Sequence, residues 1–81
     1  MEPATAGALL RQARKRASLS QVDLAARAGV TQSVISAYES GRRQPAVPTF
    51  AALVDATGSE LVIGLRRQPR RIHLRLRDVR G

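Results

Sequence analysis

The fold is decided by residues 21–40, QVDLAARAGVTQSVISAYES. Ser20, just before this stretch, and Thr31, inside it, are residue types that begin helices, because their side-chain oxygens accept the first free backbone N–H groups. Asp23 stands three residues after Ser20 and completes a capping box. Gly29 is expected to end the first helix, since glycine readily adopts the left-handed conformation needed there. The stretch therefore predicts two short helices joined by a very tight turn.

Apolar residues inside the stretch recur where two steeply crossing helices would share a core. Ala25 is small at the point of closest approach, and Gly29 permits the turn between the helices. Two caps, a glycine turn and several apolar positions must all agree, so the pattern is specific for a helix-turn-helix. The apolar positions are Leu24, Ala28, Val30, Ile35 and Tyr38.

Helices are also expected on both sides of this stretch. Residues 5–17 carry alanine and leucine at i, i+3, i+4 and i+7 spacing, with basic residues and glutamine opposite, which is typical of an amphipathic helix. The second helix of the central pair is expected to stop near Gly41, where a polar segment follows. Another helix is expected to begin around Pro48 and to end at Gly58. Residues 1–58 are thus predicted to form one mainly helical domain.

Residues 59–81 change to an apolar period of two, which predicts strands with a turn near Gln68 and Pro69. We expect the second strand, which runs to Asp78, to fold back on Ile63 as a hairpin with its apolar residues inside and its arginines outside. Two other interpretations stay open for this basic segment, namely an arm that adds phosphate contacts and a surface that docks an acidic partner. The alternating apolar residues are Leu61, Ile63, Leu65, Ile72, Leu74 and Leu76.

Composition limits the kinds of function. A chain of 81 residues supports one domain with a small core, which disfavours an enzyme with a buried multi-part site. Cysteine is absent and His73 is the only histidine, so we predict no disulfide, no metal site, no cofactor and no enzymatic activity. No targeting segment and no apolar run long enough for a membrane span stand out, and the protein is expected in the cytoplasm, associated with the nucleoid.

The charge balance indicates a polyanionic partner. Fourteen Lys and Arg against six Asp and Glu give a net charge of +8, and residues 65–81 hold seven of the basic residues and one acidic residue. Tyr38 and Phe50 are the only aromatic residues, so the chain lacks the stacking platform that single-strand binders use. Duplex DNA is therefore the expected partner.

The helix over about residues 31–40 is the candidate recognition helix. At about 100° per residue, its small polar residues fall on one arc and its apolar residues on the other. Gln32 is suited to donate to and accept from an adenine edge, and serine hydroxyls serve most bases. The residues predicted to contact bases are Gln32, Ser33, Ser36 and Ala37.

Other residues are placed to hold the helix in register. Side chains at helix starts and just beyond the recognition helix are expected to contact sugar and phosphate, and these are Gln21, Thr31, Ser40, Arg42 and Arg43. Glu39 is an acid at the rim of the inward arc, where a cation must neutralise it. We predict that Arg14 is that cation and that the pair ties the recognition helix to the scaffold.

These residues resemble the Cro/CI-type (XRE) helix-turn-helix family over about residues 5–58. The resemblance implies a mainly α, lambda-repressor-like domain of four to five short helices, in which Gln21 binds phosphate and Arg14 pairs with Glu39. Some family members carry glutamine at the position of Ala37, where this chain offers at most a methyl contact. The matching motifs are Ser20-Gln21, Leu24-Ala25, Gly29-Val30, Thr31-Gln32, Ile35-Ser36 and Glu39-Ser40-Gly41.

A strand directly after the fourth helix is similar to that of HipB-type antitoxins, in which it pairs with its twin across a dimer axis. This resemblance implies that Leu61, Val62, Ile63 and Leu65 form an intersubunit strand, since self-pairing covers an exposed edge. We therefore expect a homodimeric repressor that binds a palindromic operator with half-sites roughly 34 Å apart. The alternative is an antitoxin that mainly binds and neutralises a toxin protein and uses DNA binding for autoregulation.

Overall fold

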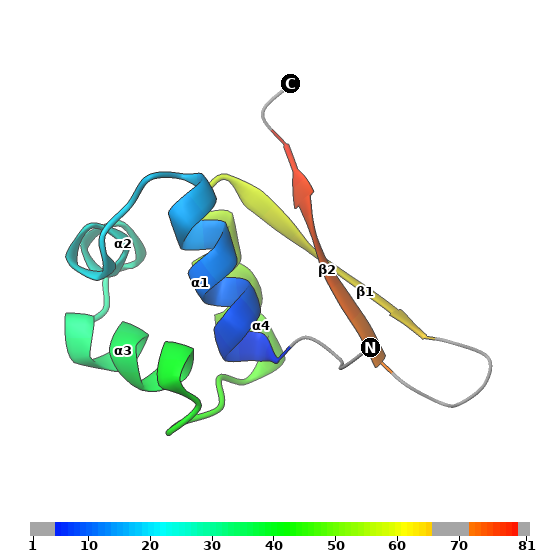
Figure 1. The fold of residues 1–81 in the computed structure, drawn as a ribbon, viewed down its shortest axis with the longest axis horizontal. Coiled ribbons are helices and arrows are strands. Elements are labelled where there is room, and N and C mark those ends of the chain that lie inside the picture. Colours follow the sequence, from blue (N-terminus) through cyan, green and yellow to red (C-terminus); the bar gives the residue numbers. More distant parts are fainter. Residues whose placement is uncertain (1–4, 66–71, 80–81) are drawn as a thin grey trace.

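The computed structural model describes residues 5–65 and 72–79, and within them four helices precede a two-stranded antiparallel sheet. Figure 1 shows α2 and α3 at one end of the molecule, α1 and α4 in the middle and the hairpin on the far side. The mainly helical fold with a C-terminal hairpin that the sequence predicted is confirmed. The elements are α1 (Ala6–Arg16), α2 (Gln21–Ala28), α3 (Gln32–Ser40), α4 (Val47–Asp55), β1 (Ser59–Leu65) and β2 (Ile72–Asp78).

The starts of α2 and α3 follow local side-chain chemistry. Ser20 Oγ accepts the Asp23 backbone N–H at 3.0 Å, and an Asp23 carboxylate oxygen accepts the Ser20 N–H at 3.1 Å, which confirms the capping box. Thr31 Oγ1 accepts the Val34 N–H at 3.3 Å. Gly29 ends α2 with φ of 70°, in the left-handed region where a side chain would add strain. These caps explain why only two residues, 30 and 31, separate Gly29 from α3.

Helix α4 departs from its predicted bounds at both ends. It begins at Val47, one residue before the expected Pro48, and its cap residue Ala46 has no side-chain oxygen to accept a hydrogen bond. It ends at Asp55 rather than at Gly58. A turn fills the interval, in which the Gly58 N–H donates to Asp55 O at 2.9 Å. The chain therefore leaves the helix one turn earlier than the glycine suggested.

All four helices contribute to one core. Leu10, Leu24, Ile35 and Val54 have no exposed surface. Helix α1 lies close against α3 at Gly7, where an added methyl group would overlap a backbone carbonyl oxygen of α3. The remaining members of the core are Leu9, Ala25, Tyr38, Phe50 and Leu53.

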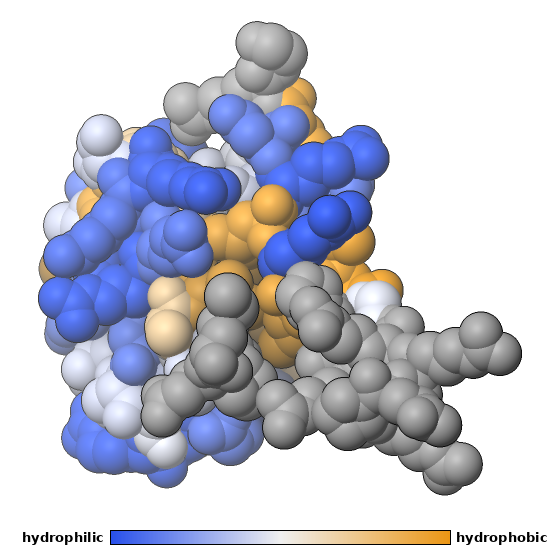
Figure 2. Space-filling view, turned by 45° about the vertical axis from the view of Figure 1, so that its right-hand side comes forward, coloured by the Kyte–Doolittle hydropathy of each residue, from blue (hydrophilic) through white to orange (hydrophobic). Residues whose placement is uncertain are grey.

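The hairpin packs on the same core. Leu61 lies opposite Leu76 and Ile63 opposite Leu74, so the predicted return of the second strand onto Ile63 is confirmed. Leu61, Leu74 and Leu76 are partly buried against the helices, whereas Ile63 is 46 % exposed. Figure 2 shows apolar surface in the middle of this face, with polar residues on both sides.

The outward face of the hairpin is polar. Arg75 and Arg77 are exposed, as the hairpin interpretation predicted, and Arg77 Nε lies 3.3 Å from a Glu60 carboxylate oxygen. The helices end before residue 59, where the strands begin, and the strands share the helical core. The division into residues 1–58 and 59–81 stays a prediction.

Several predictions fall outside the described residues, namely the turn at Gln68 and Pro69, the arginines at 66, 67, 70, 71 and 80, and the side chains of Leu65, Ile72 and His73. Among residues 5–65 and 72–79, the helices are too short and too polar to cross a membrane. The same residues contain no group of three or more His, Asp or Glu side chains that could hold a metal ion.

Candidate nucleic-acid interface

Helix α3 presents a small polar surface to the outside. Gln32, Ser33 and Ser40 are exposed and Ser36 is half-buried, while Ile35 on the opposite side has no exposed surface. This division follows the two arcs that the helical period predicted. The exposed side is free of acidic residues, since the carboxylate of α3 lies on its inner rim. A phosphate backbone would therefore meet no like charge along it.

Ala37 is an exception to the predicted arc. It was expected to face outward, but only 9 % of it is exposed. The loop after α3 folds back over this turn, because the Arg43 backbone N–H donates to Ala37 O at 3.2 Å. Ala37 therefore lies at the base of a hollow of about 350 Å³ beside α3. The hollow is lined by Gln32, Ser33, Val34, Ser36, Ala37, Arg42 and Arg43.

Arg14 and Glu39 form the ion pair predicted from the sequence. Arg14 Nε and Nη2 donate to the two Glu39 carboxylate oxygens at 2.7 and 2.9 Å, and Arg14 Nη1 donates to Leu19 O at 2.9 Å. The side chains are only 11 % and 5 % exposed. Hydrogen bonding to Glu39 raises the pKa of Arg14 above its already high usual value. The two-pronged contact ties the last turn of α3 to α1 and hides the carboxylate from a bound polyanion.

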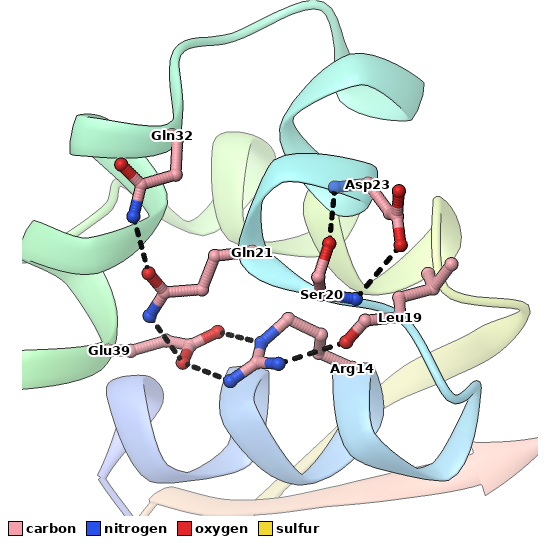
Figure 3. Close-up of polar contacts among 7 residues, drawn as sticks. All are labelled: Arg14, Leu19, Ser20, Gln21, Asp23, Gln32 and Glu39. Atoms are coloured by element: carbon pink, nitrogen blue, oxygen red, sulfur yellow. Dashed lines mark hydrogen bonds and ion pairs between the residues drawn. The ribbon is translucent and has the colours of Figure 1, made fainter.

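The ion pair continues outward through two glutamines, as Figure 3 shows. Gln21 Nε2 donates to Glu39 Oε1 at 3.2 Å, and Gln32 Nε2 donates to Gln21 Oε1 at 2.7 Å. A carboxylate paired with a guanidinium only accepts hydrogen bonds, so it determines which end of the Gln21 amide faces inward. Gln21 in turn offers its oxygen to Gln32. The ion pair of Arg14 with Glu39 thereby determines which group donates and which accepts in the hydrogen bonds from Gln21 to Glu39 and from Gln32 to Gln21.

The hydroxyl groups of Thr31 and Ser40 each make hydrogen bonds within the protein. Thr31 Oγ1 accepts the capping bond from Val34, which leaves its O–H free to donate. Ser40 Oγ donates to Ala37 O at 3.1 Å and accepts from Arg42 Nε at 3.0 Å. Both residues are exposed beside the outer face of α3.

The two arginines after α3 point in different directions. Arg42 lies back along α3, with Nη2 3.4 Å from Ser36 Oγ in addition to its bond with Ser40. The Arg43 guanidinium carbon stands 5.7 Å from the centre of the Tyr38 ring, within the range of a cation–π contact. The sequence predicts one role for both residues, as phosphate contacts, and carries no signal for this difference, which depends on the path of the loop.

Sequence reasoning also missed the coupling of Gln21 to Gln32. Both are the first residues of their helices, and the tight turn at Gly29 brings the two helix starts together. That shared position is the signal that could have indicated the contact.

Comparison with known proteins agrees with this geometry. A family model described as helix-turn-helix matches residues 10–63, which include α2, α3, α4 and most of α1 and β1. A search of curated proteins and a search of solved structures found no match. The family match covers well over half of the chain and contains the whole network from Arg14 to Glu39. The chain belongs to the Cro/CI-type (XRE) helix-turn-helix family of DNA-binding regulators.

Proposed function

We propose that the protein binds a palindromic duplex operator in a sequence-specific manner as a homodimer and represses transcription, with α3 in the major groove. The observation that carries this proposal is the exposed, uncharged and small-residue face of α3, anchored from behind by the Arg14–Glu39 pair. Small side chains let a helix approach base edges closely, and a fixed helix holds them in register.

Gln32 is the principal base-reading residue in this proposal. One of its amide N–H groups is held by Gln21, which leaves the second N–H and the Oε1 atom available to a base. A donor and an acceptor side by side match the N7 and N6 groups of adenine. Ser33 and Ser36 add hydrogen bonds along the same arc, and Ala37 contributes only the base of the hollow.

Phosphate contacts would come from the ends of the helices. Gln21 keeps one amide N–H and Thr31 keeps its hydroxyl hydrogen after their internal bonds, and Arg43 is exposed at the far end of α3. These groups carry no sequence information and would fix where the helix sits along the groove. Ser40 and Arg42 are the remaining proposed phosphate contacts, and Ser40 would have to release its hydrogen bond to Ala37 O in order to donate to a phosphate oxygen.

The dimer is proposed to form through β1. A two-stranded sheet has open edges, and it is marginally stable without further cover. Ile63 is 46 % exposed in the middle of β1. A second copy placed on this strand would cover both the edge and the isoleucine, and the half-sites of the operator are proposed to lie roughly 34 Å apart.

Selection of the full chain against random duplex DNA tests the proposal. We expect an enriched two-fold symmetric site, and we expect Gln32→Ala to reduce discrimination at one base pair of each half-site by about 1–3 kcal/mol. Ser20→Ala is the control, because it weakens the start of α2 without touching the outer face of α3. Failure of the wild-type chain to enrich any site would end the proposal.

Sedimentation of two lysine variants tests the dimer. Ile63→Lys should shift the chain toward monomer, whereas Val22→Lys, on α2 and 63 % exposed, should leave the association state unchanged. A monomeric wild-type chain at the concentration that binds DNA would refute the dimer while leaving sequence-specific binding to the selection experiment.

A further inference from the structure

Arg42 occupies an unexpected place for a residue of the loop that follows α3. Its side chain returns along the helix instead of following the chain away from it. Nε donates to Ser40 Oγ at 3.0 Å, and Nη2 lies 3.4 Å from Ser36 Oγ. These serines follow Gln32 at intervals of four residues, so the guanidinium covers the last turns of the face that Gln32 begins.

The loop backbone holds Arg42 in this position. Gly41 adopts φ of 80°, which reverses the chain direction after α3, and its N–H donates to Tyr38 O at 3.2 Å. One residue after Arg42, the Arg43 N–H donates to Ala37 O at 3.2 Å. Arg42 is therefore flanked by two backbone bonds to α3, and its side chain starts beside the hollow that it lines.

The two serines bond one side of the Arg42 guanidinium and leave the N–H groups at its outer end without a serine partner. Arginine has five N–H donors, and the bonds to serine use the one on Nε and one on Nη2. Two donors on Nη1 and one on Nη2 remain, and one N–H from each of these nitrogens forms the end-on pair of parallel N–H groups. Such a pair matches the O6 and N7 acceptors of guanine in the major groove, the commonest specific contact that arginine makes with DNA.

Charge separates Arg42 from the rest of the α3 face. Helix α3 itself has no basic residue, so its outer side chains are neutral amide, hydroxyl and methyl groups. Arg43, the neighbouring cation, stacks near the Tyr38 ring and is not bonded to the outer serines. Arg42 thus brings both a positive charge and a bidentate donor to this face.

We propose that Arg42 is a specificity-determining residue that reads a guanine in each half-site, with Ser36 and Ser40 orienting its guanidinium. The proposal rests on the proposed function, in which α3 enters the major groove. It changes the role of Arg42 from a phosphate contact, which fixes register, to a base contact, which selects sequence.

The test measures binding of the wild-type chain, Arg42→Gln and Arg42→Lys to the selected operator and to its single-base-pair variants, each at several salt concentrations. Arg42→Gln should lose about 5- to 150-fold discrimination for guanine at one base pair per half-site and keep its preferences elsewhere. Arg42→Lys keeps the charge but lacks the planar fork, so it should lose most of the same preference. Arg43→Gln is the matched control, and it should weaken all sequences alike.

The salt dependence separates the two roles. A phosphate contact predicts equal weakening of every sequence by Arg42→Gln and a salt slope smaller by about 0.9, and that result would overturn the proposal. A wild-type chain that selects no sequence would refute the proposed function itself. A wild-type chain that selects a site while Arg42→Gln retains every base preference would refute only the role of Arg42. Thermal unfolding of each variant identifies any loss that comes from misfolding.

Discussion

Gly7→Ala provides a test of how α1 positions the recognition helix. A methyl group built on Gly7 would overlap the carbonyl oxygen of Tyr38 and lie 2.9 Å from that of Glu39. Both obstacles are backbone atoms, so no rotamer change relieves them. Ordinary contacts between carbon and a carbonyl oxygen are about 3.3–3.6 Å long, so α1 and α3 would have to separate by roughly one ångström.

Two opposing effects set the size of the change. Alanine is more favourable than glycine inside a helix by about 0.8–1 kcal/mol. Overpacking a close contact costs about 1–3 kcal/mol, and here it also strains the Gly41 N–H bond to Tyr38 O, which closes α3. We expect a net destabilisation of up to about 2 kcal/mol, which corresponds to a fall in melting temperature of about 4–8 °C for each kcal/mol.

Chemical and thermal unfolding of Gly7→Ala and Ala8→Gly together decide the matter. Ala8 is exposed on α1, so Ala8→Gly should cost only its helix propensity, about 1 kcal/mol. If propensity governed both positions, Gly7→Ala would be more stable than the wild-type chain. A stabilised Gly7→Ala variant with unchanged DNA affinity would refute the close approach of α1 to the end of α3.

Three further predictions concern the polar framework. Glu39→Gln leaves the Arg14 guanidinium largely buried without its counter-charge, so it should lower the free energy of unfolding in urea by about 3–5 kcal/mol. Glu60→Gln removes one partner of an exposed pair and should lower it by at most about 1 kcal/mol. Similar losses for the two variants would contradict the difference in burial. Hydrogen bonds from the Ser20 backbone and side chain lower the pKa of Asp23 in the folded chain. The ionised Asp23 carboxylate therefore stabilises the fold above the usual pKa of 3.8, and this stabilisation is lost as pH falls through the folded pKa. Asp23→Asn should show a weaker loss of stability below about pH 4. Thr31→Ala should lower stability by about 0.5–2 kcal/mol through loss of the α3 cap, and an unchanged melting temperature would argue against that cap.

Features governed by local chemistry were predictable from the sequence. Ser20 and Thr31 begin helices through bonds to residues three positions away, and Gly29 ends one through its own backbone conformation. The Arg14–Glu39 pair was predictable for a different reason, since an acid on a surface meant for DNA requires a cation. In each case the information lies in residue type and spacing.

Features that depend on how the elements meet were not predictable. The spacing of residues 5–17 places Gly7 on α1 but says nothing about its distance from α3. The 3.6-residue period puts Ala37 on the outer arc, yet the loop after α3 covers it. Arg42 and Arg43 are adjacent and chemically identical in sequence, and only the folded loop directs one to serines and the other to an aromatic ring.

The hydrogen-bond network along α3 distinguishes outer residues that can be substituted without loss of a hydrogen bond from those that cannot. Within the part of the chain that the structure describes, Ser33 is exposed and makes no side-chain hydrogen bond, so its replacement costs the fold little. Gln32 is joined through Gln21 to a nearly buried carboxylate, and a change there removes the hydrogen bond that Gln21 Oε1 accepts. Descendants of this regulator would therefore acquire new binding sites first through position 33, because a substitution there leaves an already folded protein to be selected.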